Sequence, residues 1–293
     1  MLIVIVGPTG SGKTALALSL ADFYHAPIIN GDAFQIYQDM NIGTAKVEKD
    51  SDAYNKHYLL DIVKPSETYS VKQYQDSFRK TFLSLKKDYQ NIIVCGGTGL
   101  YIKAALYDYE FEDEEEADVS DLETLSNEEL YAILKKVDEK ALQTIHMNNR
   151  KRVIRAIQIA RTHNLTKSEI IDKQGHTLFF KDEVVRFYFI SPNREELYAN
   201  INARVEQMFE KGLVDEVKML LQKYELSSTA KAAIGYKEVI DYLDGKYSLE
   251  ECKELIKKRT RNYAKRQVTF FKHQLPCLEY SSKEDLLKEA THE

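Results

Sequence analysis

The sequence of 293 residues has few of the residues that form linkers, disulfides and metal clusters: 12 Gly, 5 Pro, 3 Cys and no Trp. So little Gly and Pro leaves little room for long linkers. A composition of 43% hydrophobic and 30% charged residues excludes disordered and collagen-like proteins. Cys95, Cys252 and Cys277 lie far apart and form no C-x-x-C pair, which excludes a disulfide framework and a zinc cluster. This cysteine usage is typical of the reducing cytosol, and we expect a cytoplasmic protein.

Long hydrophobic runs are also absent. The apolar run at residues 1–6 has no basic leader and is too short for a signal peptide or a membrane span. We therefore expect no membrane association. A chain of this length corresponds to about two domains, and it can bury enough surface to fold without a disulfide or a metal.

The net charge of −5 conceals an uneven distribution. Residues 108–129 contain 12 acidic residues and no Lys or Arg; without them, 41 basic residues stand against 46 − 12 = 34 acidic ones, a remainder of +7. We expect this acidic block to be a solvent-facing segment. Two stretches, 149–161 and 255–278, are rich in Lys and Arg, and the second contains no acid. On a helix, several of its cations would share one face, which indicates either an anionic partner such as nucleic acid or a solvated surface.

The pattern of apolar residues alternates between short strands and helices. We expect strands at 2–6, 27–30, 59–63, 92–95 and 184–190, and helices at 14–24 and 71–89. Such alternation predicts a parallel sheet whose functional site lies at the carboxyl ends of the strands. From 122 to 172 the pattern is helical, with a capping box at residues 126–129, and from 194 onward it is mostly amphipathic helix. The sequence thus predicts an α/β core formed by residues 1–110 and 181–293, with an all-helical insertion domain at 111–180.

Residues 7–14 form a phosphate-binding motif, G-x-x-x-x-G-K-[ST]. The string is Gly7, Pro8, Thr9, Gly10, Ser11, Gly12, Lys13 and Thr14. Its glycines allow backbone N–H groups to point at phosphate oxygens, and the helix that follows adds its positive end. Lys13 would reach the outer phosphate, and the Thr14 hydroxyl would ligate Mg²⁺. The motif predicts a P-loop NTPase-like core that binds a di- or triphosphate, without indicating which one.

Further motifs resemble one family, the tRNA dimethylallyltransferases or tRNA isopentenyltransferases. They lie at residues 7–14, 32–37, 41–46, 57–61, 96–101, 149–155, 233–238 and 259–267. The resemblance implies transfer of a dimethylallyl group from dimethylallyl diphosphate to the exocyclic amine of the adenosine 3′ of the anticodon in tRNA. The P-loop would then hold the prenyl diphosphate rather than ATP. No Cys/His set resembles the zinc finger of eukaryotic members, which favours the bacterial form.

The resemblance also implies roles for individual residues. Asp32 is expected to take the proton of the amine, and Lys13 to stabilise the departing diphosphate together with Mg²⁺. Thr98 is expected to contact the diphosphate and the target nucleotide, and Gln35 to read a base edge. The residues expected to contact the tRNA anticodon stem-loop are Asp32, Ala33, Phe34, Gln35, Thr98, Lys151, Arg152, Arg155, Gly235, Tyr236, Lys258, Arg261 and Lys265. No protein partner is implied.

Three positions depart from the family pattern, and several alternatives stay open. Ala33 stands where the family commonly has Ser, Asn149 where it has an acid, and Lys237 where some members have Arg. Asp32 is alternatively an outer ligand of Mg²⁺ or a structural cap, and Tyr236 is alternatively a core residue. The alternative functions are a P-loop small-molecule kinase, a prenyltransferase acting on free adenosine nucleotides, and a nucleotide-gated RNA-binding module.

Overall fold

The computed structural model describes residues 1–109, 111, 117–163, 166, 168–169 and 177–292. The chain divides into two units, one formed by residues 1–106 and 180–293 and the other by residues 107–179. The boundary expected at 110 lies a few residues beyond this division, and the one expected at 180 lies next to it.

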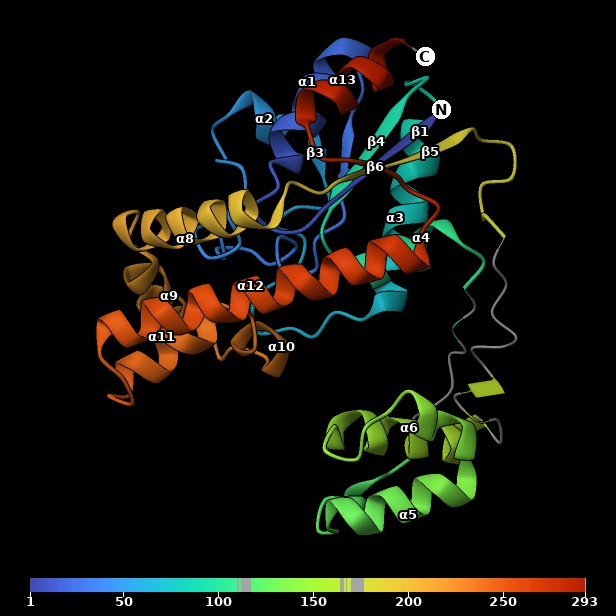
Figure 1. Ribbon diagram of the computed structural model, residues 1–293, viewed down its shortest axis with the longest axis vertical. Helices are drawn as coiled ribbons and strands as arrows, with labels where there is room; N and C mark the ends of the chain where they lie inside the picture. The colour runs from blue at the N-terminus through green and yellow to red at the C-terminus, as the bar shows by residue number, and fades with distance from the viewer. Residues whose placement is uncertain (110, 112–116, 164–165, 167, 170–176, 293) are drawn as a thin grey trace. The chain divides into compact units, whose positions relative to one another are not determined.

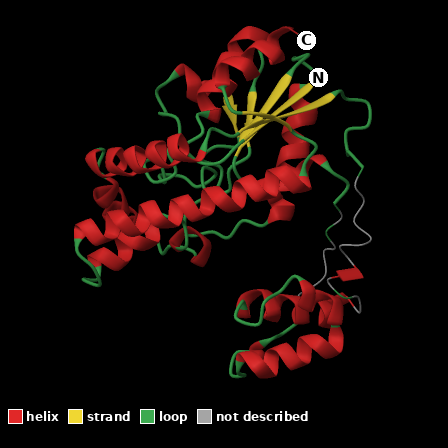
Figure 2. Cartoon of the chain, in the orientation of Figure 1, coloured by secondary structure: helices red, strands yellow, loops and turns green. Residues whose placement is uncertain are grey.

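A sheet of six strands forms the centre of the first unit in the described part of the chain (Figures 1 and 2). The strands are β1 (Leu2–Val6), β2 (Ile28–Asn30), β3 (His57–Tyr58), β4 (Ile92–Gly96), β5 (Val185–Ile190) and β6 (Leu278–Tyr280). Their order is β3-β2-β4-β1-β5-β6, and every neighbouring pair is parallel. β1 is buried along its whole length because helices cover both faces of the sheet, which is why its sequence is continuously apolar.

The first unit contains ten helices among the described residues. They are α1 (Lys13–Tyr24), α2 (Asp52–Asn55), α3 (Val71–Leu85), α4 (Gly99–Leu106), α8 (Arg194–Glu210), α9 (Leu213–Lys223), α10 (Ser228–Lys231), α11 (Tyr236–Leu243), α12 (Leu249–Gln274) and α13 (Lys283–His292). α1 and α13 cover one face, where Leu20 and Leu286 join a core with Ile3 and Ile5. α3 and α4 lie on the opposite face (Figure 1). This arrangement confirms the predicted α/β fold with a P-loop NTPase-like sheet flanked by helices.

A helical layer follows β5. α8 packs against α9 and α12, and α12 also contacts α11 and α4 (Figure 1). α12 is the long helix of this layer, and it starts with a capping box in which Ser248 and Glu251 exchange hydrogen bonds. Because α12 reaches α4, which directly follows β4, it brings residues near the C-terminus to the end of the sheet where the P-loop lies.

No described helix is long and apolar enough to cross a membrane.

The second unit is helical in its described part and has its own core. Its elements are η1 (Ser120–Leu122), α5 (Asn127–Val137), η2 (Glu139–Gln143) and α6 (Arg150–His163). Leu130, Leu134, Val153 and Ile157 are fully buried between these elements. The capping box expected at residues 126–129 is confirmed by reciprocal hydrogen bonds at the start of α5. Residues 110 and 112–116 of the acidic block, and 164–165, 167 and 170–172 of the expected helical region, lie outside the described residues.

Two predicted elements differ from the structure. The strand predicted at 59–63 is wrong: β3 ends at Tyr58, because Leu59 and Asp61 adopt left-handed backbone angles, φ 64° and 54°. The backbone turns there so that the Asp61 side chain can bind Lys46. The helix predicted at 71–89 ends at Leu85. The short edge strand β6 was not expected, because its three residues are half exposed and carry little apolar pattern.

Candidate functional site

Three turns meet at the carboxyl ends of β1, β2 and β4. The turn after β2 and the turn after β4 are joined by two backbone hydrogen bonds, from Gly31 N–H to the Cys95 carbonyl (2.8 Å) and from Thr98 N–H to the Gly31 carbonyl (3.1 Å). A Cβ atom on Gly96 would lie 2.2 Å from the Gly31 carbonyl oxygen, so only glycine allows this approach. The two turns therefore hold Asp32 and Thr98 in a fixed relation to each other.

The P-loop has the structure that its sequence predicts. It connects β1 to α1, and Gly10 and Gly12 adopt left-handed angles, φ 82° and 81°, that side-chain-bearing residues rarely adopt. α1 begins at Lys13, so its unpaired N–H groups face the loop. Ser11 is almost fully buried, and its hydroxyl has no hydrogen-bond partner in the described part of the chain. A buried polar group without a partner is costly, and it indicates that the loop is built around a ligand.

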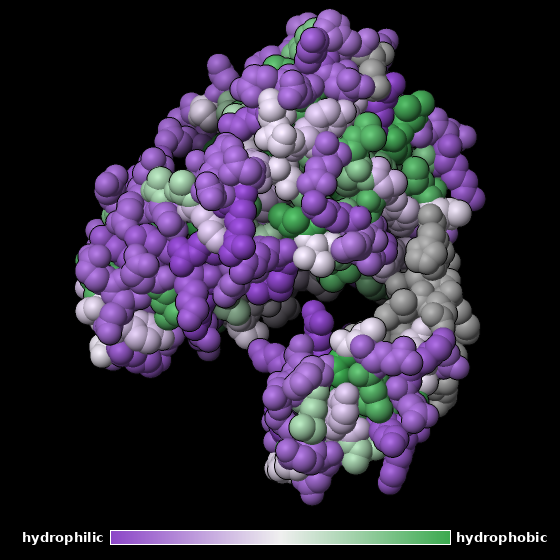
Figure 3. Space-filling view, viewed as in Figure 1, coloured by the Kyte–Doolittle hydropathy of each residue, from purple (hydrophilic) through white to green (hydrophobic). Residues whose placement is uncertain are grey.

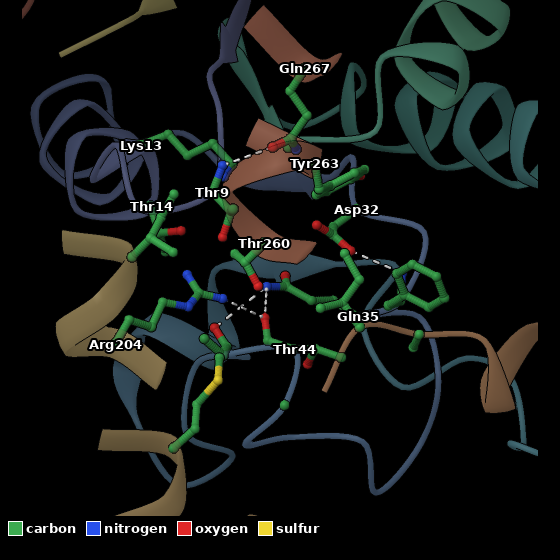
Figure 4. A pocket seen from close by; sticks show the side chains of 18 of the residues that line it. Thr9, Lys13, Thr14, Asp32, Gln35, Thr44, Arg204, Thr260, Tyr263 and Gln267 are labelled. Atoms are coloured by element: carbon green, nitrogen blue, oxygen red, sulfur yellow. Dashed lines mark hydrogen bonds between the residues drawn. The ribbon is translucent and has the colours of Figure 1, made fainter. Parts of the chain in front are cut away.

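A cavity of about 310 Å³ opens beside the P-loop (Figure 4). Lys13, Thr14 and Arg204 lie on one side of it in this view, and Asp32, Gln35 and Tyr263 lie on the other. The remaining wall is mainly apolar and comes from α8, α12 and two loops. Its apolar members are Val47, Ile201, Val205, Met208, Ala232, Ala233, Ile234 and Ile256. The cavity is thus lined by both cationic and apolar side chains.

Two cations at the P-loop end are desolvated. Burial lowers the pKa of the Lys13 ammonium below its ordinary value, Cys95 and Asp32 oppose this shift, and Arg204 adds to it. Burial also lowers the pKa of the Arg204 guanidinium, again opposed by Asp32. Among the described ion pairs, neither cation has a carboxylate oxygen within 4.0 Å. Because a buried charge is stable only with a counter-charge, this end of the cavity is suited to an anion.

Two hydrogen bonds fix Asp32, one through its carboxylate and one through its backbone N–H. One oxygen accepts a hydrogen bond from the Phe34 N–H (2.9 Å), and the Asp32 N–H donates to the Asn30 side chain (3.1 Å). No other hydrogen bond to this carboxylate occurs among the residues that the structure describes. The second oxygen is therefore available to accept a proton from a molecule in the cavity.

The Thr98 hydroxyl lies behind Asp32 and is not part of the cavity wall. It accepts a hydrogen bond from the Ala33 N–H (3.0 Å), the residue that follows Asp32. Tyr263 of α12 approaches the same place, and burial together with Asp32 raises its pKa to about 12. Thr98 and Gln267 lie close enough to Tyr263 to oppose this rise. Thr98 thus fixes the turn that carries Asp32, and its contact with the diphosphate and the target nucleotide, which the family resemblance implies, stays a prediction.

Gln35 and Arg204 share one acceptor. The Gln35 amide donates to the Thr44 carbonyl (3.1 Å), and the Arg204 guanidinium donates to the same oxygen (3.4 Å) (Figure 4). Gln35 was predicted as a base-reading residue and does line the cavity, together with Phe34. The backbone of residue 44 thus sets the positions of two polar side chains of the site.

Arg204 and Gln267 are among the site residues that the sequence analysis missed. Arg204 lies in α8, whose sequence indicates only an amphipathic helix. Gln267 of α12 is buried; its carbonyl accepts from Thr9 N–H (2.9 Å) and its amide donates to the Gly97 carbonyl (2.8 Å). Gln267 therefore ties the P-loop to the turn after β4. Its position within the 259–267 motif was the only available signal.

Tyr236 is a core residue, so the expected contact of its ring with tRNA is corrected. The side chain is 1% exposed, and its hydroxyl donates to the Glu216 carboxylate (2.6 Å). A ring in this position cannot reach RNA. Gly235 adopts φ 97° and precedes α11, where its N–H donates to the Glu238 carboxylate (2.6 Å). Both residues position α11 in the structure.

The basic stripe on α12 is partly engaged within the protein. Lys258, Arg261 and Lys265 recur at helical spacing, and the face of α12 seen in Figure 3 is predominantly hydrophilic. Arg261 donates to Asn202 (2.7 Å), whereas Lys258 and Lys265 are exposed. Lys272, on the same stripe, pairs with Glu279 (2.9 Å). Two exposed cations of the predicted set therefore remain at the surface of this helix.

The basic stretch of α6 likewise divides into two groups. Arg150 donates to the carbonyls of the segment before α5, and Arg161 forms a two-point ion pair with Asp121 (both 2.8 Å). These two arginines stabilise the second unit itself. The predicted RNA contacts of this unit, Lys151, Arg152 and Arg155, are exposed along α6.

The comparisons with known proteins agree over most of the chain. The family model for IPP transferase matches residues 35–274. A tRNA dimethylallyltransferase from Anoxybacillus flavithermus is 39% identical over 290 residues, which are 98% of this chain and 92% of the relative. The crystal structure of tRNA delta(2)-isopentenylpyrophosphate transferase from Staphylococcus epidermidis is 36% identical, with a TM-score of 0.70 over 99% of this chain and 97% of that chain. A eukaryotic dimethylallyltransferase acting on tRNA is 28% identical, with a TM-score of 0.78 over 95% of this chain and 73% of that chain.

Proposed function

The chain belongs to the IPP transferase family, and from this premise we propose that it is a tRNA dimethylallyltransferase. It transfers the dimethylallyl group of dimethylallyl diphosphate to the exocyclic amine of the adenosine 3′ of the anticodon and releases diphosphate. The observation that carries the proposal is the composition of one cavity, which is lined both by two desolvated cations beside the P-loop and by a set of apolar side chains. A diphosphate with a short hydrocarbon tail matches both kinds of side chain.

Asp32 acts as the general base. The amine of adenine is a poor nucleophile because its lone pair is delocalised into the ring. As the bond between this nitrogen and the dimethylallyl carbon forms, the bond from that carbon to the diphosphate oxygen breaks, and the amine proton passes to the Asp32 carboxylate. The hydrogen bond from Phe34 N–H fixes one carboxylate oxygen and leaves the other for the proton. Positioned bases of this kind contribute about 10²–10⁴-fold to the rate.

Lys13, Arg204 and the P-loop N–H groups stabilise the departing diphosphate. Negative charge accumulates on this group as the carbon–oxygen bond breaks, and both cations lie at the P-loop end of the cavity. Fixed positive groups in a site shielded from water stabilise developing charge strongly. The same anion also adds negative charge beside Lys13 and Arg204, whose charged forms Asp32 already favours.

The residues near the P-loop suit Mg²⁺ that enters together with the diphosphate. Thr14 offers a hydroxyl and Asp32 a carboxylate, and Mg²⁺ prefers such oxygen ligands in combination with substrate phosphates. No group of three or more His, Cys, Asp or Glu is placed to hold a metal alone within the described ranges. We assign Thr14 as the protein ligand. When bound, the ion neutralises part of the charge of the diphosphate.

The target adenosine must leave the anticodon loop stack to reach the cavity, which costs a few kcal/mol. Gln35 is placed to read the flipped base, because its side chain lines the cavity beside Asp32. The exposed cations of α6 and α12 bind phosphates of the anticodon stem-loop, since single-stranded loops are recognised through splayed bases and backbone contacts. These are Lys151, Arg152, Arg155, Lys258 and Lys265.

The function is tested by mass spectrometry of nucleosides from tRNA incubated with the protein, dimethylallyl diphosphate and Mg²⁺. We expect a dimethylallyl group on one adenosine, mapped to the position 3′ of the anticodon, and loss of the product when EDTA is added. ATP-dependent phosphorylation of a small molecule without prenylated tRNA would instead identify a kinase. Faster reaction with AMP than with an anticodon stem-loop would identify a free-nucleotide prenyltransferase.

Replacing Arg152 with Ala will weaken tRNA binding and reduce its dependence on salt. Each phosphate contact releases condensed counterions, so losing one should make the slope of log affinity against log salt concentration shallower by about 0.7–0.9. The measurement is a binding titration at several salt concentrations. Lys87→Ala, an exposed lysine of the other unit, serves as control and should leave the slope unchanged. An unchanged slope in Arg152→Ala contradicts the assignment of α6 as an RNA-binding helix.

A further inference from the structure

A buried carboxylate outside the cavity holds one of the loops that line it. Glu216 of α9 accepts hydrogen bonds from three successive backbone N–H groups, those of Asn41 (3.1 Å), Ile42 (2.8 Å) and Gly43 (3.3 Å). It also accepts the Tyr236 hydroxyl (2.6 Å). Glu216 is 9% exposed, and burying a carboxylate is costly unless such hydrogen bonds compensate for the lost water.

The ring of Tyr236 packs closely against the same loop, at Gly43. A Cβ atom on Gly43 would lie 2.4 Å from a ring carbon of Tyr236, so the loop backbone packs directly on the ring. This explains why position 43 is glycine although its backbone angle does not require one. Glu216 thus holds the backbone of residues 41–43 by hydrogen bonds, and the ring of Tyr236 holds it by close packing.

The loop that Glu216 and Tyr236 hold continues directly into the wall of the cavity. One residue after Gly43, the Thr44 carbonyl accepts the hydrogen bonds of both Gln35 and Arg204. The Thr44 hydroxyl donates to the Met40 carbonyl (2.7 Å), which keeps residues 40–44 in one tight turn. A shift of residues 41–43 would therefore move the oxygen that orients both side chains.

We propose that Glu216 and Tyr236 are positioning residues that set the donor site through the loop at 41–44. Glu216 holds the loop N–H groups, the loop presents the Thr44 carbonyl, and that carbonyl aims Arg204 at the diphosphate. The inference rests on the proposed function, because it takes Arg204 to be a diphosphate ligand. Neither Glu216 nor Tyr236 lines the cavity.

The test is a double-mutant cycle that uses inorganic pyrophosphate with Mg²⁺ as ligand and calorimetry as readout, so that no turnover is needed. Glu216→Gln replaces an acceptor oxygen by an amide NH2 that repels the loop N–H groups, and Arg204→Lys replaces the guanidinium that donates to Thr44 by a shorter ammonium group. We expect each to weaken pyrophosphate binding about tenfold or more, the size of one hydrogen bond to a charged group. The double variant should be no weaker than the weaker single variant, because both changes disturb the same guanidinium.

Three results separate the inference from the proposed function. Full binding by Glu216→Gln, or additive losses in the double variant, would overturn the inference alone. Failure of the unmodified protein to bind pyrophosphate would overturn the phosphate site and the inference with it. Equal loss of pyrophosphate and tRNA binding in Glu216→Gln would show general unfolding and also count against positioning.

A milder variant and a matched control complete the design. Tyr236→Phe keeps the ring against Gly43 and removes only one hydrogen bond to Glu216, so it should fold and weaken pyrophosphate binding about two- to fivefold. It should also raise the KM for dimethylallyl diphosphate with little change in tRNA affinity. Asp215→Asn, next to Glu216 but exposed and paired with Lys218, should behave like the unmodified protein. A Tyr236→Phe protein with unchanged donor KM contradicts the role of the hydroxyl.

Discussion

Replacing Asp32 with Asn will lower the rate of dimethylallyl transfer by about 10²–10⁴-fold, while pyrophosphate and tRNA binding stay nearly unchanged. The amide of Asn can still accept the hydrogen bond from Phe34 N–H, so the turn keeps its geometry. It cannot take up the amine proton, and the proton must pass to water instead. The measurement is a single-turnover reaction with saturating enzyme, which reports the transfer step separately from binding and release.

The control for this variant is Asp88→Asn, which changes the net charge by the same amount at an exposed turn after α3. Its transfer rate should equal that of the unmodified protein. Normal transfer by Asp32→Asn would refute the base assignment. Loss of pyrophosphate binding in Asp32→Asn would assign the carboxylate to the binding of the metal and the diphosphate instead.

Replacing Asp61 with Asn will destabilise the first unit by about 3–5 kcal/mol, because it leaves the Lys46 ammonium buried without its counter-charge. The two side chains are 8% and 0% exposed, and their charged atoms lie 2.6 Å apart. The other Asp61 oxygen accepts the Tyr54 hydroxyl (2.8 Å), and burial with Asp61 raises the pKa of Tyr54 to about 12. Thermal unfolding followed by circular dichroism should show a midpoint lower by on the order of 10 °C.

An exposed ion pair supplies the comparison. Asp244 lies 3.3 Å from Lys246 on the surface, where water screens both charges. Asp244→Asn should therefore shift the midpoint by about 1–2 °C at most. Equal shifts in the two variants would show that the Lys46–Asp61 pair adds no more than a surface pair does.

The sequence predicted those features that depend mainly on residues close together in the chain. The strand, glycine turn and helix of the P-loop could be predicted because left-handed glycines and a continuous apolar run leave few other structures. Asp32 was identified as a site residue because parallel strands place their carboxyl ends on one edge. The β2 and β4 turns do lie together there, joined through Gly31 and Gly96.

The rest depends on contacts between distant parts of the chain. Arg204 and Gln267 enter the cavity because α8 and α12 pack beside the sheet, and no local pattern in either helix indicates that. The segment at 59–63 looks like a strand, but its course is set by the bond between Asp61 and Lys46, which the apolar pattern cannot reveal. The sequence left Tyr236 open between an RNA contact and a core residue for the same reason, since its partner Glu216 lies twenty residues away.

The segment inserted between α4 and β5 is separate from the residues that form the donor cavity. Every residue that lines the donor cavity belongs to segments 1–106 and 180–293. The inserted segment can therefore change its length, surface charge or loop sequences without altering the groups that activate the prenyl donor.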